Sequence, residues 1–188
     1  LGSGSLPMLN VNAGSIANSG SGQITGSGLI NVPGGINNDG IIAPGNGLGA
    51  LPIIGDLAFT GGGTYVAEIG AGPSADNIDV TGNVTIAAGA ALDIQGFGGY
   101  TGNASDSFNI LSASGSVTGV FGASQAPAFT LSIDPTYNLS SVDLLVLSAL
   151  FNDFTGVINS DWNTAGNWSL GAVPIPSNGV RINGAAAV

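Results

Sequence analysis

The sequence predicts an all-β protein built as a parallel β-solenoid, and three observations lead to this fold class. Aliphatic residues recur every six positions through the first third of the chain. Clusters of Gly, Asn and Pro separate short aliphatic segments along most of the remaining sequence. No segment carries the 3.6-residue period of an amphipathic helix. A fixed short period is typical of solenoids, in which each repeat forms a short strand followed by a turn.

The six-residue rhythm begins near residue 22 and ends near residue 54. Its aliphatic members are Ile24, Ile30, Ile36, Ile42, Leu48 and Ile54, and Gly22, Gly28, Gly34 and Gly40 lie two positions ahead of the first four. We expect each hexad to form one side of a coil and to point one aliphatic side chain inward. Glycine suits such corners because they often need a positive φ, and Asn37, Asn38 and Asp39 are the usual substitutes. The alternative is a flexible Gly/Ser linker, which the regular aliphatic positions disfavour.

From Leu51 onward the repeats lengthen and individual strands become readable. Glycine-rich turn clusters at residues 61–63, 70–73 and 96–99 separate several of them. The predicted strands are Leu51–Ile54, Leu57–Phe59, Thr64–Ile69, Ile78–Val80, Val84–Ile86, Leu92–Ile94, Phe108–Leu111, Phe129–Ile133 and Val142–Leu147. The last of these has aliphatic residues on both faces, as in a strand that is buried on both sides.

A change in composition divides the chain into two parts. Residues 1–148 form the predicted β-solenoid, for which we expect a right-handed coil. Residues 149–188 form a short C-terminal β extension that carries both tryptophans. The last ~30 residues of the chain are too few to bury a core of their own. We therefore expect the extension to dock on the solenoid or to be completed by another chain.

Composition excludes most catalytic and binding chemistries. Arg181 is the only cationic side chain, and the 188 residues contain no Lys, His or Cys. Nucleophilic catalysis and proton transfer near pH 7 usually depend on these residue types. The formal net charge of −10 leaves no basic patch for nucleic acid or anionic lipid, and no apolar run approaches the ~20 residues that span a bilayer. We expect no enzyme, no nucleic-acid partner and no membrane insertion.

Asp76 and Asp79 are the candidate ligands for a metal ion, because calcium binds carboxylate oxygens at turns. Glu68 and Asp93 would join them only if successive coils stack these residues nearby. The alternative, which we favour, is that both aspartates cap turns by bonding their own backbone. Paired acids also serve glycoside hydrolysis, but no basic residue accompanies these acids in the sequence. Apart from calcium, no cofactor is expected.

Trp162 and Trp168 lie six residues apart in the C-terminal extension. Their rings suit stacking on sugar rings. The alternative is a local hydrophobic plug where a solenoid begins or ends, and we favour this interpretation.

An ordered set of motifs covers residues 35–147. The segment Gly35-Ile-Asn-Asn-Asp-Gly-Ile-Ile-Ala-Pro-Gly-Asn-Gly-Leu-Gly comes first, Asp76-Asn-Ile-Asp-Val-Thr-Gly follows, and Val142-Asp-Leu-Leu-Val closes the set. In this order the motifs resemble repeats near the end of autotransporter passenger domains. The resemblance implies a parallel β-helix with a bacterial cell-surface or extracellular location, and it implies no activity.

A second motif lies in the C-terminal extension. The segment Asp161-Trp-Asn-Thr-Ala-Gly-Asn-Trp-Ser-Leu-Gly-Ala-Val-Pro resembles a repeat of large secreted bacterial surface proteins. In those proteins the repeat opens a new stretch of β-solenoid.

The two ends of a solenoid expose unpaired strand edges, which natural proteins usually cap with charges or bulky loops. Neither end of this sequence resembles such a cap, because Leu1 to Val11 carry no charge and the last residues stop inside what resembles a repeat. We therefore expect an extracellular structural protein that self-assembles head-to-tail into a surface filament or matrix fibre, with its last segment donated as a strand. The expected interface residues are Trp162, Trp168, Val180, Arg181 and Ile182. One alternative is an adhesin passenger domain that binds glycans or surfaces, and another is that neighbouring coils lie in the same polypeptide.

Overall fold

The regular structure of this chain is almost entirely β-strand. The computed structural model describes residues 7–129, 131–147, 151–154, 157–159, 161–168, 173 and 179–182. These residues contain no α-helix and two short 3₁₀ turns, η1 (Phe97–Gly99) and η2 (Ala165–Asn167). The predicted all-β fold class is confirmed.

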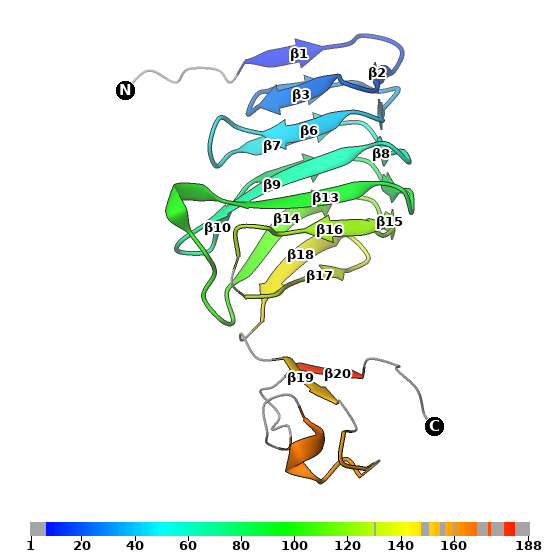
Figure 1. Ribbon diagram of the computed structural model, residues 1–188. Coiled ribbons are helices and arrows are strands. Elements are labelled where there is room, and N and C mark those ends of the chain that lie inside the picture. Colours follow the sequence, from blue (N-terminus) through cyan, green and yellow to red (C-terminus); the bar gives the residue numbers. More distant parts are fainter. Residues whose placement is uncertain are drawn as a thin grey trace.

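Most strands belong to three sheets, named A, B and C here (Figure 1). Sheet A consists of β1 (Met8–Asn10), β4 (Leu29–Asn31), β7 (Ala50–Ile54), β11 (Asn77–Val80), β14 (Ser107–Ala113), β18 (Ser141–Val146) and β17 (Ile133–Tyr137), in this order. Sheet B consists of β2 (Ile16–Asn18), β5 (Ile36–Asn38), β8 (Leu57–Phe59), β12 (Val84–Ile86) and β15 (Val117–Gly119). Sheet C consists of β3 (Gln23–Gly26), β6 (Ile41–Pro44), β9 (Thr64–Gly70), β13 (Ala91–Gly96) and β16 (Ala123–Gln125), with β10 (Ser74–Ala75) antiparallel to β9.

The chain visits the three sheets in turn, and one passage through A, B and C is called a circuit here. Five circuits follow one another from β1 to β16, and their strands pair in parallel with those of the next circuit. In sheet B, Ile36 pairs with Leu57, Leu57 with Val84, and Val84 with Val117, so the spacing grows from 21 to 27 to 33 residues. Longer turns between the strands accommodate this growth, while the strands keep their register.

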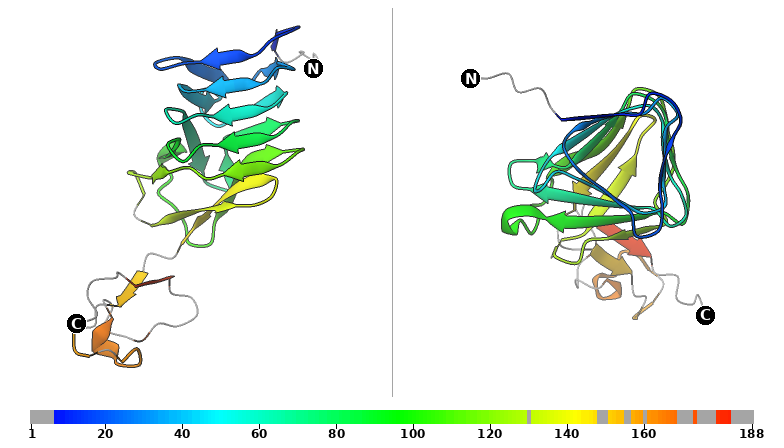
Figure 2. Two further views of the ribbon diagram at one scale, coloured as in Figure 1. Left: turned by 90° about the vertical axis from the view of Figure 1, so that its right-hand side faces the viewer. Right: turned by 90° about the horizontal axis from the view of Figure 1, so that it is seen from above.

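The core lies between the three sheets, which enclose a common interior when seen from above (Figure 2). Strand residues alternate between this interior and the outer surface, as the two-residue period of a strand requires. The inward positions form aliphatic rows along the circuits, such as Ile36, Leu57, Val84 and Val117 in sheet B, all of which are buried. Each aliphatic side chain removed from water in this way contributes about 1.5–3 kcal/mol.

The six-residue rhythm matches the strands only over the first two circuits. Ile24, Ile30, Ile36 and Ile42 fall in β3, β4, β5 and β6, and the last three are buried. Leu48 lies between strands, and the Ile54 side chain is 39% exposed. The prediction that these two residues point inward was therefore wrong. The turn between β6 and β7 breaks the six-residue spacing, so the inward positions of β7 are Leu51 and Ile53.

The hexad glycines serve a purpose other than the predicted one. Gly22, Gly28, Gly34 and Gly40 do not have positive φ, and Ser105 is the only non-glycine residue with positive φ among the described residues. The prediction of positive φ at Asn37, Asn38 and Asp39 was thus wrong. At Gly40 a Cβ atom would collide with the backbone carbonyl oxygen of Gly22 in the preceding circuit. Glycine is needed here because two circuits approach closely.

Sheet A ends in an antiparallel ribbon, which differs from the expected all-parallel arrangement. The ribbon consists of β18, which runs antiparallel to β14, and β17, which runs antiparallel to β18. The strand predicted at Phe129–Ile133 instead begins at Ile133 and continues to Tyr137. Phe121 fills the end of the core beside the ribbon, with its ring 5.3 Å from Phe59 and 6.4 Å from Tyr137.

The C-terminal part contains a separate two-stranded sheet. In it β19 (Phe151–Phe154) pairs in parallel with β20 (Gly179–Ile182), beyond the β17 end of sheet A in Figure 1. The predicted domain boundary after residue 148 lies outside the described residues and stays a prediction.

Candidate functional site

The two candidate calcium ligands do not share a site. Asp76, just before β11, points toward the core and is 1% exposed, whereas Asp79 within β11 is exposed on the outer surface. The Ser112 hydroxyl donates a hydrogen bond to Asp79 Oδ1 at 3.0 Å. Within the described part of the chain no three His, Cys, Asp or Glu side chains gather in a way that could hold a metal ion.

Asp76 links three segments of the chain. Its Oδ1 accepts a hydrogen bond from the backbone N–H of Gly49 at 2.8 Å, and its Oδ2 accepts one from the backbone N–H of Glu68 at 3.0 Å. The favoured interpretation, in which Asp76 bonds its own turn, was therefore wrong. Burial raises the pKa of Asp76 to about 6, although the two N–H donors pull it down, and the nearby charge of Glu68 raises it further.

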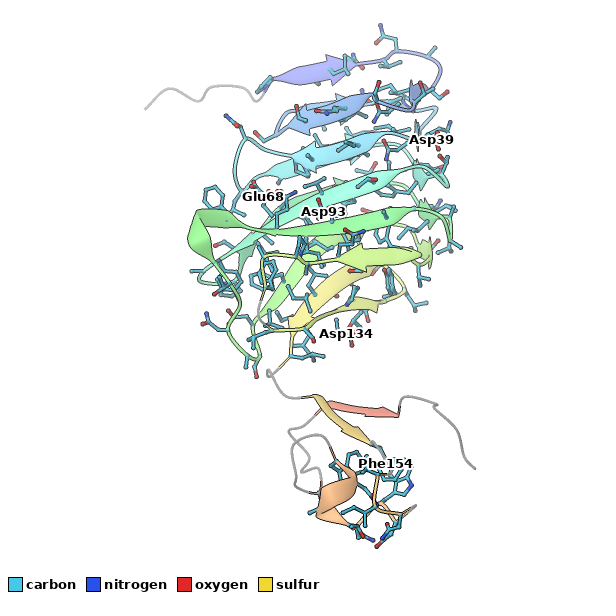
Figure 3. All side chains as sticks on the ribbon, in the orientation of Figure 1. Asp39, Glu68, Asp93, Asp134 and Phe154 are labelled. Carbon is cyan, nitrogen blue, oxygen red and sulfur yellow. The ribbon has the colours of Figure 1, made fainter. Side chains whose placement is uncertain are left out.

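Glu68 and Asp93, the two possible additions to the calcium site, lie on the outer side of sheet C (Figure 3). Asp93 accepts a hydrogen bond from the Gln95 side chain at 2.9 Å. Glu68 pairs in register with Gln95 of the next circuit. Both acids therefore belong to the polar outer surface of sheet C.

The tryptophans form an aromatic cluster with Phe154, defined here as Phe154, Trp162 and Trp168. The Phe154 ring centroid lies 5.1 Å from that of Trp162 in a stacked arrangement and 5.1 Å from that of Trp168 in an edge contact. Trp168 is buried, and its indole N–H donates a hydrogen bond to the Trp162 carbonyl oxygen at 2.7 Å. Trp162 keeps 48% of its surface exposed. Figure 3 labels Phe154 in the C-terminal part of the chain.

The remaining predicted interface residues lie in β20. Val180, Arg181 and Ile182 pair with Asn152, Asp153 and Phe154 of β19, respectively. Phe154 therefore connects the tryptophans to β20, so the structure brings the predicted interface residues into one unit. The sequence did not lead us to include Phe154 among the interface residues, although the segment Phe151-Asn-Asp-Phe carries two aromatic residues.

The two ends of the three sheets differ in their strand edges. At the N-terminal end β1, β2 and β3 each pair with one neighbour only, within the part of the chain that the structure describes. At the other end β17 carries Asp134 and Pro135, and a charge and a missing N–H both protect an edge strand from further pairing. The Leu139 carbonyl oxygen also accepts a hydrogen bond from the Val117 N–H of β15 at 2.8 Å. The ribbon thus ends sheet A and contacts β15, whereas β15 and β16 each pair with one strand among the described residues.

No family model matches the chain, and no curated protein matches its sequence. Among the described residues, no helix is long and apolar enough to cross a membrane. The strand edges and the aromatic cluster are the features from which a function can be inferred.

Proposed function

We propose that the chain is an extracellular structural protein of the bacterial cell surface. In this proposal it is a right-handed parallel β-solenoid that self-assembles head-to-tail into a filament or matrix fibre. One observation carries the proposal: the parallel sheets end at β1, β2 and β3 in strand edges without partners among the described residues. Such edges are templates for pairing with another chain.

The rest of the described surface supports a structural role. Apart from the buried Asp76, the acids whose burial the structure describes lie on the outer faces and corners. Several hydrogen-bond to a neighbouring circuit, as Asp39 does with the hydroxyl of Thr60 at 2.6 Å and the N–H of Gly62 at 2.9 Å. Both contacts lower the pKa of Asp39. Hydrogen bonds of this kind hold neighbouring circuits together.

The sheet of β19 and β20 is the donor in the proposed assembly. An isolated two-stranded sheet is marginally stable in water. Its strands run parallel, which matches the parallel pairing within sheets A, B and C. Pairing it with the N-terminal edges of a second copy joins two different surfaces, and such heterologous contacts produce filaments when they do not close into rings.

Removal of residues 162–188 tests the donor role. We expect the full chain to form filaments in negative-stain electron microscopy, and the shortened chain to remain as single rods because it lacks β20. Circular dichroism of both proteins controls for loss of the β-sheets. Filaments of unchanged length and number from the shortened chain would contradict strand donation.

The half-exposed ring of Trp162 supports a second candidate, a glycan-binding adhesin. Monodisperse rods of the full chain that bind a glycan array, with binding lost in Trp162→Ala, would favour this function over the filament.

A further inference from the structure

The N-terminal end face, defined here as β1, β2, β3 and the space between them, leaves the core uncovered. An open hollow of about 620 Å³ lies there, and its lining includes Leu9, Ile16 and Ile24. Leu9 is 54% exposed, whereas Ile30, its partner in the next circuit, is 6% exposed. The aliphatic rows that fill the interior thus continue to this surface without a covering layer in the described chain.

Two asparagine ladders also end at this face. Asn18 Nδ2 donates to Asn38 Oδ1 at 2.7 Å and to the Ile41 carbonyl oxygen at 3.0 Å. The Ile41 carbonyl oxygen can only accept a hydrogen bond, so the Asn18 amide atom that faces it must be Nδ2. The other amide atom, Asn18 Oδ1, accepts no hydrogen bond from the described residues. On the outer side of sheet A, Asn31 donates to Asn10 Oδ1 at 3.0 Å. The face therefore presents an amide acceptor at Asn18 and an amide donor at Asn10.

The end face is also electrically neutral. The first charged residue in the sequence is Asp39, so every acid and Arg181 lie beyond the first circuit. Two molecules of net charge −10 repel each other over most orientations. Repulsion is weakest where one molecule presents its uncharged end, and no Lys blocks the strand edges there.

From these observations we infer that the N-terminal end face is the docking surface for a second copy of this chain. The inference rests on the proposed self-assembly and names its acceptor surface. The second copy adds strand edges to β1, β2 and β3, covers the hollow, and extends the asparagine ladders, which set the register. The opposite end of the sheets is less open, because the ribbon of β17 and β18 ends sheet A there with Asp134 and Pro135, and in the described chain only β15 and β16 of sheets B and C have one paired neighbour each at that end.

A matched pair of charge substitutions in the full chain tests the acceptor surface. Leu9→Lys introduces a cation at the mouth of the hollow, and Val120→Lys introduces the same charge near the opposite end, at a residue that is 49% exposed. We expect Leu9→Lys to lower the association constant, measured by sedimentation velocity, by about tenfold or more, as for a central interface residue. Val120→Lys should stay within about twofold of the unchanged chain. The inference would be overturned if both variants lowered the association constant equally, or if Leu9→Lys left it unchanged.

A third full-length variant separates this inference from the proposed strand donation. Val180→Pro removes a backbone N–H from β20 and so disrupts the strand pairing of the proposed donor sheet. If copies dock head-to-tail, Leu9→Lys and Val180→Pro are each monomeric, and their mixture forms heterodimers. If Val180→Pro alone still associates while Leu9→Lys does not, the end face is the docking surface and donation by β20 is wrong. If the unchanged chain is monomeric at every concentration tested, both proposals fail.

Discussion

Asp76 illustrates how a single side chain joins distant parts of this molecule. Its two carboxylate oxygens accept N–H groups from Gly49 and Glu68, which belong to different segments of the chain. Tyr65, fully buried beside it, donates its hydroxyl to the Ile110 carbonyl oxygen at 2.6 Å. The sequence indicated Asp76 and Asp79 alike as candidate calcium ligands, but the burial of Asp76 depends on residues that only folding brings close.

The raised pKa of Asp76 predicts a pH dependence of stability. The folded pKa is about 6 and the ordinary value is 3.8, so between these pH values the folded chain holds a proton that the unfolded chain has lost. The contribution of Asp76 to the free energy of unfolding therefore rises as pH falls from 7 to 4, by at most about 3 kcal/mol.

Urea unfolding at pH 7.5 and pH 4.5 checks this prediction. We expect Asp76→Asn to reduce the gain in stability at the lower pH, because the amide does not titrate. The control is Asp79→Asn, which removes an exposed carboxylate of the adjacent strand and corrects for weaker repulsion among the acids. An equal pH response in Asp76→Asn and Asp79→Asn would contradict the assignment.

At the scale of elements, the turn between β5 and β6 shows why the six-residue rhythm contains glycine. The Gly40 backbone N–H donates to the Asn18 carbonyl oxygen at 3.0 Å, so the two circuits are in direct contact at this corner. The sequence predicted a corner with glycine at this position, and that much is correct. Its physical reason is the closeness of the Gly22 carbonyl group, which no local pattern reveals.

Gly40→Ala and Gly61→Ala should differ sharply in stability. The Cβ atom at Gly40 meets backbone atoms of the preceding circuit, whereas a Cβ atom at Gly61 meets nothing within 4 Å. We expect Gly40→Ala to lower the free energy of unfolding by about 1–3 kcal/mol through overpacking. Gly61→Ala should be neutral or stabilising by up to about 1 kcal/mol, since alanine restricts the unfolded chain. Thermal unfolding measures both, and equal destabilisation would show that the corner relaxes freely.

The closing ribbon is the element that sequence reasoning described least well. Its strand β18 was predicted nearly to its bounds from the run at Val142-Asp-Leu-Leu-Val. The strand β17 was displaced, because Asp134 and Pro135 resemble turn residues in isolation. Both residues are acceptable on an edge strand, where one side needs no partner. The antiparallel direction follows from the short turn at residues 138–140.

For the whole molecule, the order of the circuits predicts a gradient of local stability. Strands β9, β11 and β13 have neighbours on both sides and bury their inward residues, whereas β1 is exposed at all three positions and pairs on one side. We expect amide hydrogen exchange of the dilute protein to be at least about 100-fold slower in β9, β11 and β13 than in β1.

The control for this experiment repeats the hydrogen-exchange measurement at a protein concentration at which the chain assembles. Under assembling conditions the amides of β1, β2 and β3 should become protected, while those of β17 should change little because the ribbon edge stays free. Uniform exchange along the chain in the dilute protein would contradict the gradient. Protection that rises at β17 instead of β1 would place the contact at the opposite end.

The sequence by itself determined the fold class, the aliphatic rows of the first two circuits and the absence of His, Cys and Lys chemistry. These properties follow from composition and from spacings of a few residues, which the chain carries before it folds. The tertiary structure decided the use of the hexad glycines, the burial of Asp76, the antiparallel closure of sheet A and the contact of Phe154 with both tryptophans. Each of these depends on atoms that folding brings together, such as those of Gly22 and Gly40 or of Gly49 and Asp76. Contacts at these separations are set by packing and register, and local patterns do not record them.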